Sequence, residues 1–93
     1  VLVTIFSPKY LEKSIEIVNQ LRMAEINTEL YLEPEAKLDK QLKYADRKNI
    51  PFVIILGPEE IKKKVITLRD MKAKTQKKLT LKQLLALPTL EVN

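Results

Sequence analysis

Apolar residues in the first third of the chain follow a strand pattern, then a helical pattern, then a strand pattern again. Residues 1–6 (VLVTIF) form a short apolar run that is typical of a buried strand. Pro8 suits the first position of a helix, because its missing N–H would have no partner there. Residues 28–32 (TELYL) are rich in strand formers and return the chain to the sheet. Between them, apolar residues at helical spacing predict one buried helix face: Leu11, Ile15, Val18 and Leu21.

The middle of the chain predicts a second helix followed directly by a central strand. The helix runs from about residue 36 to residue 48, with an apolar face at Leu38, Leu42 and Ala45. Asn49 is suited to a left-handed terminator, and the proline after it forbids continuation of the helix. Residues 51–56 (PFVIIL) contain no polar position, which is typical of a strand buried on both faces in a parallel sheet.

The last third predicts a hairpin and a closing helix. Residues 58–63 (PEEIKK) are interpreted as a turn, and residues 65–69 and 74–79 as paired strands. Thr80 and the glutamine three positions later fit a capping box for a last helix. The predicted fold class is α/β, with three layers (α/β/α). Its five-stranded mixed sheet has three parallel strands plus a C-terminal antiparallel hairpin, and three helices cover it.

Length and charge refine this prediction. The chain has 93 residues, which suffices for one small domain, and its net charge is +5. Residues 1–36 carry a net charge of −3, whereas residues 37–93 carry +8. Such asymmetry favours a surface that faces a polyanion, although lysine-rich surfaces also serve solubility alone.

Composition also limits the chemistry. Histidine and cysteine are absent, which excludes nucleophilic sites built on them and most transition-metal sites. One glycine cannot build a phosphate-binding glycine-rich loop. The adjacent Glu59 and Glu60 are interpreted as a solvated turn rather than an acid–base pair. We therefore expect neither catalytic residues nor a metal site in this chain.

The chain shows no sequence feature of a membrane or secreted protein. It lacks a run of about 18 apolar residues, and its start lacks the charged region and cleavage site of a signal peptide. It begins at Val1, directly in a predicted strand. We expect residues 1–93 to be a single domain from a longer cytoplasmic protein.

Basic side chains on the second helix are candidates for binding RNA. Lys40, Lys43 and Arg47 recur at helical spacing opposite the apolar face, with Lys37 and Gln41 beside them. These cations are candidates for phosphate contacts, and a solvated helix face would have the same pattern. Tyr44 either stacks on a base or lies at the edge of the sheet.

A carboxylate and an arginine near the hairpin form a second candidate set. Glu60 precedes the hairpin and Arg69 ends its first strand. An arginine donates to base edges and a carboxylate accepts from base amino groups, so the two can discriminate bases. The alternative is an ion pair on the protein surface that binds no ligand.

The amino-acid sequence of this central region closely resembles that of one protein family. KQLKYADRKNIPFVIILG (residues 40–57), a glutamate-bearing turn and VITLRDM (residues 65–71) resemble the C-terminal anticodon-binding domain of histidyl-tRNA synthetase. The resemblance implies a mixed sheet that holds the histidine anticodon. It also implies a separate catalytic domain, with ATP and Mg²⁺, in a parent enzyme that forms a homodimer.

The same resemblance assigns roles to residues. It implies that Glu60 and Arg69 contact anticodon bases, and it aligns Glu35 with an asparagine that does so in the related threonyl enzyme. The resemblance implies no cofactor within this domain. The alternative that stays open is a synthetase-like regulatory or dimerisation module that binds protein rather than tRNA.

Overall fold

The computed structural model describes residues 1–31, 33 and 37–87. Five strands form one mixed sheet in the order β2-β1-β3-β4-β5. Strands β1 (Leu2–Val3), β2 (Glu29–Leu30) and β3 (Phe52–Ile55) are parallel, and β4 (Ile66–Asp70) and β5 (Thr75–Leu79) add an antiparallel hairpin beside β3. This arrangement confirms the predicted sheet, although the ladders of β1 and β2 are only two residues long.

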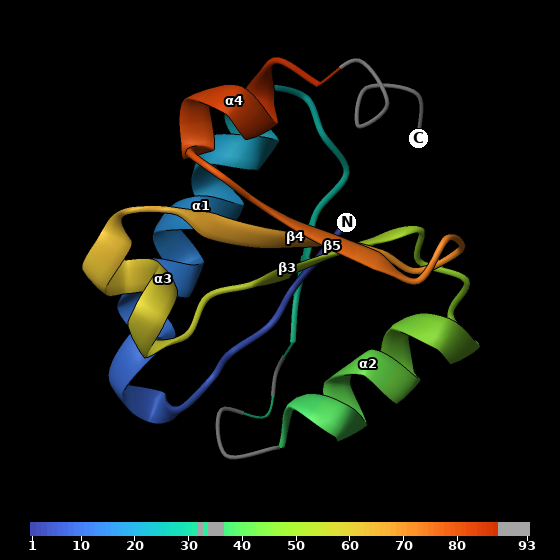
Figure 1. Cartoon of the computed structure of the whole chain (residues 1–93). Coiled ribbons are helices and arrows are strands. Elements are labelled where there is room, and N and C mark those ends of the chain that lie inside the picture. Colours follow the sequence, from blue (N-terminus) through green and yellow to red (C-terminus); the bar gives the residue numbers. More distant parts are fainter. Residues whose placement is uncertain (32, 34–36, 88–93) are drawn as a thin grey trace.

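Helices cover both faces of the sheet, as Figure 1 shows, which confirms the three predicted layers. On one face lie α1 (Leu11–Met23) and α4 (Leu81–Leu85), whose buried residues pack against Ile54 and Leu68. On the other face, α2 (Leu38–Arg47) packs against Val53. The two cores are separate because alternate residues of β3 point to opposite faces.

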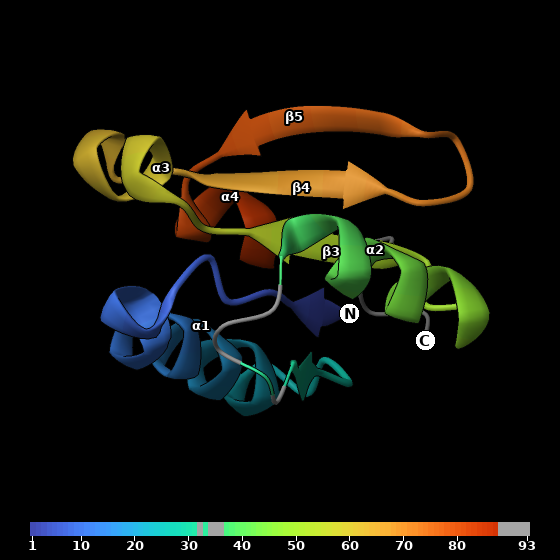
Figure 2. The same cartoon turned by 90° about the horizontal axis from the view of Figure 1, so that it is seen from below.

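The described chain holds four α-helices, one more than the sequence analysis predicts. Helix α3 (Pro58–Lys63) stands where a turn is predicted. Proline at its first position, glutamates in its first turn and lysines in its last turn all favour a helix. Lys64 ends it in the left-handed conformation, at φ 56°. Figure 2 shows α3 at the open end of the hairpin, opposite the turn between β4 and β5, where α3 connects β3 to β4.

The first helix corrects a second prediction. A short 3₁₀ turn (Pro8–Tyr10) precedes α1, and Ser7 at its start makes no side-chain capping bond. Ile17, rather than Ile15, enters the core, since Ile17 is 3% exposed and Ile15 is 40% exposed. The true buried face is shifted round the helix and includes Ser14, whose hydroxyl donates to the carbonyl of Thr4 at 3.2 Å.

Two helix-terminus predictions are confirmed. Asn49 has φ 57°, as expected of a left-handed residue after α2. Thr80 Oγ1 accepts from the N–H of Gln83, and Gln83 Oε1 accepts from the N–H of Thr80, which completes the capping box of α4.

Gln41 is buried, although the sequence analysis places it beside the basic residues on the exposed side of α2. Its side chain is fully enclosed. Its Oε1 accepts from the N–H of Ile5 at 2.8 Å, and its Nε2 donates to the carbonyl of the same residue at 2.7 Å. The amide thus takes the place of a neighbouring strand beyond the end of β1 and fixes α2 to the sheet.

We expect Gln41→Leu to lower the free energy of unfolding by about 3 kcal/mol, because it leaves a buried N–H and a buried carbonyl of Ile5 without their partner. Urea denaturation monitored by circular dichroism measures this. Gln20→Leu, at an exposed glutamine of α1, is the matched control and should change stability by less than about 0.5 kcal/mol. Equal effects of the two substitutions would contradict the role given to Gln41.

Candidate functional site

Glu60 is held at the start of the hairpin by two hydrogen bonds. Its Oε1 accepts from the N–H of Gly57 at 2.9 Å, and its Oε2 accepts from the hydroxyl of Thr67 at 3.0 Å. Its side chain is only 13% exposed. Glu60 therefore caps α3 and is fixed in place before any ligand arrives.

The single glycine of the chain makes this arrangement possible. A Cβ added to Gly57 would lie 3.0 Å from Oε1 of Glu60 and 3.2 Å from the ring of Phe6. The backbone of Gly57 has φ −105°, so the requirement is space rather than an unusual conformation.

Arg69 lies on the same face of the sheet as Thr67, because the two residues are two apart on β4. It stands opposite Val53 on β3 and Gln76 on β5. Its Nη1 donates to Oε1 of Gln76 at 2.8 Å, and its Nε is enclosed without a hydrogen-bond partner among the described residues. Arg69 and Thr67, the hydrogen-bond partner of Glu60, thus lie on the same, α2-bearing face of β4.

A cavity of about 380 Å³ opens on this face between the start of α2 and the hairpin. We call it the hairpin groove. Its floor is apolar and its rim carries a carboxylate, a hydroxyl, an amide and two ammonium groups, which together suit a nucleobase with its phosphate. The groove is lined by Leu38, Ile55, Glu60, Thr67, Gln76, Lys77 and Lys78.

An ion-pair network includes two residues of the hairpin groove, Glu60 and Lys78. Nζ of Lys78 lies 2.7 Å from Oε1 of Glu59 and 3.9 Å from Oε2 of Glu60, and Lys63 lies 3.1 Å from Glu59. The hydrogen bonds from Lys78 and Lys63 lower the pKa of Glu59 to about 2. The bond to Glu59 likewise raises the pKa of Lys78. The network joins α3 to the edge strand β5.

The basic residues of α2 lie on its other flank. Lys40, Tyr44 and Arg47 line a cavity of about 270 Å³ beside the edge strand β2. Lys40 pairs with Glu33 at 2.8 Å, and this bond raises the pKa of Lys40. Lys43 is exposed and lies 3.9 Å from Asp39. These cations and the hairpin groove therefore do not share one cavity.

Tyr44 lies at the edge of the sheet, the second of its two predicted positions. Its ring meets that of Tyr31 edge to face, with centroids 5.3 Å apart. Its hydroxyl donates to a carboxylate oxygen of Glu29, which raises the pKa of Tyr44. The side chain is half-buried and also lines the cavity beside β2.

The remaining predicted site residues lie near the start of α2. Lys37 is exposed at the N-cap position, one residue before Leu38 of the hairpin groove. Glu35 falls outside the described residues. Among the predicted phosphate contacts, Lys37 is thus the one that is adjacent in sequence to a residue of the hairpin groove, Leu38.

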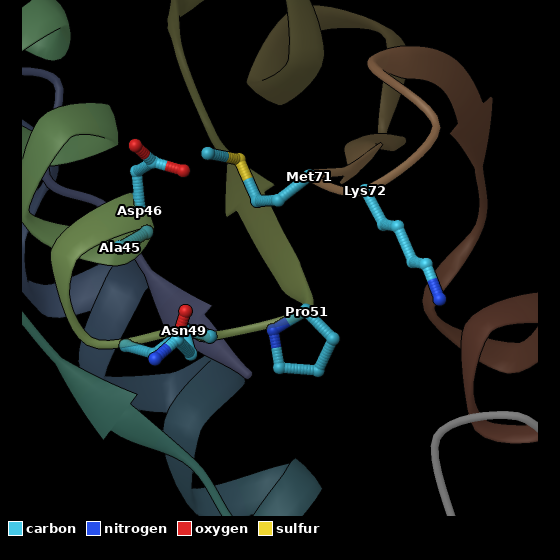
Figure 3. A pocket seen from close by; sticks show the side chains of 7 residues that line it. Ala45, Asp46, Asn49, Pro51, Met71 and Lys72 are labelled. Carbon is cyan, nitrogen blue, oxygen red and sulfur yellow. The ribbon is translucent and has the colours of Figure 1, made fainter.

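Figure 3 shows a further cavity, of about 290 Å³, at the opposite end of α2. The side chain of Asp46 points toward that of Met71 from the hairpin turn, Asn49 lies beside Pro51, and the side chain of Lys72 extends away from them. Within the part of the chain that the structure describes, no group of three or more acidic, histidine or cysteine residues is placed to hold a metal ion. No described helix is long and apolar enough to cross a membrane.

Sequence reasoning missed Thr67, Gln76 and Lys78. Lys78 lies on the edge strand β5, where lysine commonly prevents unwanted pairing with other strands, so its presence there does not by itself indicate a binding site. The relation of Gln76 to Arg69 can be recognised only from the strand register, which places the two residues opposite each other.

Comparison with known proteins gives the family. Residues 1–87 match the family model described as the anticodon binding domain. The chain therefore belongs to this family of anticodon-binding domains, which confirms the predicted resemblance.

Individual relatives agree with this assignment. The chain is 40% identical to the histidine–tRNA ligase of Clostridium tetani over 73 residues, covering 78% of the chain and 16% of that relative. It is 36% identical to the threonine–tRNA ligase of Campylobacter lari over 81 residues, covering 87% of the chain and 13% of that relative. The crystal structure of histidyl-tRNA synthetase from Nostoc superposes with a TM-score of 0.86 and 26% identity, over 90% of the chain and 20% of that protein. The chain thus spans about a sixth of its curated relatives.

We expect Glu59→Gln to lower the melting temperature most above pH 4.5. The folded-state pKa of Glu59, about 2, lies below its ordinary value of 4.5. Its stabilising effect is therefore complete above the ordinary value and is lost as the pH falls towards 2. Melting curves between pH 2 and pH 7 should show the difference from the parent chain narrowing as the pH falls.

Glu12→Gln, at an exposed carboxylate of α1 outside this network, is the control and should give a small difference at every pH. A Glu59→Gln difference that does not change with pH would show that the ion pairs do not set this pKa.

Proposed function

We propose that this domain binds the anticodon of histidine tRNA. The observation that carries the proposal is the family match over residues 1–87, and the charged hairpin groove supplies a surface that suits it. The parent protein would be a histidine–tRNA ligase, in which a separate catalytic domain uses ATP and Mg²⁺ to attach histidine.

The proposed mechanism divides base contacts from phosphate contacts. The guanidinium of Arg69 donates hydrogen bonds to a base edge. Each carboxylate oxygen of Glu60 accepts one hydrogen bond within the domain and has a further lone pair, with which it accepts from a base amino group. Glu35, which precedes α2 in the sequence, is proposed as a third base contact. Lys78, which lines the hairpin groove, and Lys37, at the N-cap of α2, neutralise phosphates.

Histidine is the favoured amino acid, because the relative described above with the higher identity is named as a histidine–tRNA ligase. A threonine–tRNA ligase is nearly as similar, so base recognition rather than overall likeness must distinguish the two anticodons. The proposal also includes residence in the cytoplasm, a homodimeric parent and no cofactor bound by this domain.

The alternative is a regulatory or dimerisation module that binds protein. The relatives compared above are named as tRNA ligases, which supports tRNA as the partner. Binding to RNA separates the two hypotheses directly.

We expect the chain to bind a histidine-tRNA anticodon stem-loop more tightly than a threonine-tRNA stem-loop, with affinity that falls steeply as salt rises. Fluorescence anisotropy with both stem-loops between 50 and 200 mM salt measures this. Absence of binding at low salt would overturn the proposed function, whereas equal binding of the two stem-loops would overturn only the histidine specificity.

We expect Arg69→Ala to weaken binding by about 1–3 kcal/mol and to reduce discrimination between the stem-loops. Lys43→Ala should weaken both stem-loops equally and reduce the slope of log affinity against log salt by about 1, if RNA covers the basic flank of α2. An unchanged slope for Lys43→Ala would confine the RNA to the hairpin side of the helix.

A further inference from the structure

Arg69 and Gln76 form a pair whose geometry bears on recognition. They are directly opposite each other on β4 and β5, and both lie on the face that carries the hairpin groove. Nη1 of Arg69 donates to Oε1 of Gln76 at 2.8 Å. This contact is exposed, so it adds little to folding stability and is open to a ligand.

The chemistry of the two groups fixes the orientation of the amide. A guanidinium only donates hydrogen bonds, so the oxygen of the Gln76 amide must face Arg69. The Nε2 donors of Gln76 are therefore directed elsewhere, and Gln76 itself lines the hairpin groove. The pair presents an arginine fork and an amide donor side by side.

The hydrogen bond that the structure gives for the guanidinium is the one to Gln76. Nε of Arg69 is enclosed and has no hydrogen-bond partner among the described residues. Packing around Nε holds the base of the fork, and the bond to Gln76 orients its Nη1 end relative to the sheet. An arginine held in one orientation loses less rotational freedom on binding than a free one, and this improves both affinity and discrimination.

We propose that Gln76 is a positioning residue for Arg69 and thereby a determinant of base discrimination. The proposal rests on the function proposed above and adds to it a residue outside the predicted site. Gln76 orients the guanidinium so that its outward N–H groups meet one base edge, and the loss of Gln76 should cost most of what the loss of Arg69 costs.

The test uses Gln76→Met, which keeps the length of the side chain and removes both its acceptor and its donors. Thr75→Val, at an exposed neighbour on the opposite face of β5, is the matched control. We expect Gln76→Met to weaken binding of the histidine stem-loop on the order of tenfold and to reduce its preference over the threonine stem-loop. Thr75→Val should change neither, and both variants should melt like the parent chain.

A double-mutant cycle then separates positioning from an independent contact. If Gln76 acts through Arg69, adding Gln76→Met to Arg69→Ala causes no further loss of affinity. If the two losses add in full, Gln76 acts by itself and the positioning role is overturned. A Gln76→Met variant that binds and discriminates like the parent also overturns it.

A spectroscopic readout tests the same role without RNA. We expect separate ¹⁵N resonances for the two Nη groups of Arg69 in the parent chain, because the bond to Gln76 slows rotation of the guanidinium. These resonances should merge in Gln76→Met and stay separate in Gln76→Glu, which keeps an acceptor. Merged resonances in the parent chain would overturn the inference, whereas a parent chain that binds no stem-loop would overturn the proposed function itself.

Discussion

The double hydrogen bond between Gln41 and Ile5 is the constraint on which the rest of the site depends. It lies beyond the end of β1, where no neighbouring strand satisfies the backbone, and it is fully enclosed. A buried amide with both ends paired tolerates little displacement, because a shift of α2 would leave two or more polar groups without partners. The position of α2 in turn sets the wall of the hairpin groove, since Leu38 lies one turn before Gln41 on that helix.

The opposite wall depends on a second polar interaction. Glu60 is at once the cap of α3 and the carboxylate of the hairpin groove, and its bond to Thr67 ties the helix to β4. Because the same side chain stabilises the turn and faces the groove, its position is set before a ligand arrives. Such preorganisation lowers the entropy that binding must overcome, so it would favour recognition at this hairpin under the proposed function.

Sequence patterns predicted the elements whose determinants are local. The apolar run of β3, the left-handed Asn49 and the capping box of Thr80 each depend on a few adjacent residues, and all were confirmed. The errors concern long-range partners. The sequence pattern places Gln41 on the surface, because its hydrogen-bond partner, the backbone of Ile5 beyond the end of β1, is distant in sequence. Gln76 is likewise one of several polar residues on β5, and only the strand register pairs it with Arg69. The sequence analysis predicted a turn in place of helix α3, although the proline, the acidic first turn and the basic last turn favour a helix. The segment has only six residues, and a segment of that length is also compatible with a turn.

The distribution of charge has a consequence for how RNA would enter. The chain carries +5 overall, yet Lys40, Lys63 and Lys78 are already paired with carboxylates. These exposed pairs are weak, so a phosphate competes with Glu59 for Lys78 at small cost. Such an exchange would leave Glu59 paired with Lys63. Under the proposed function, the lysines would attract and align the RNA backbone. The discrimination of bases would fall to Glu60 and Arg69, which hydrogen bonds within the domain hold in place.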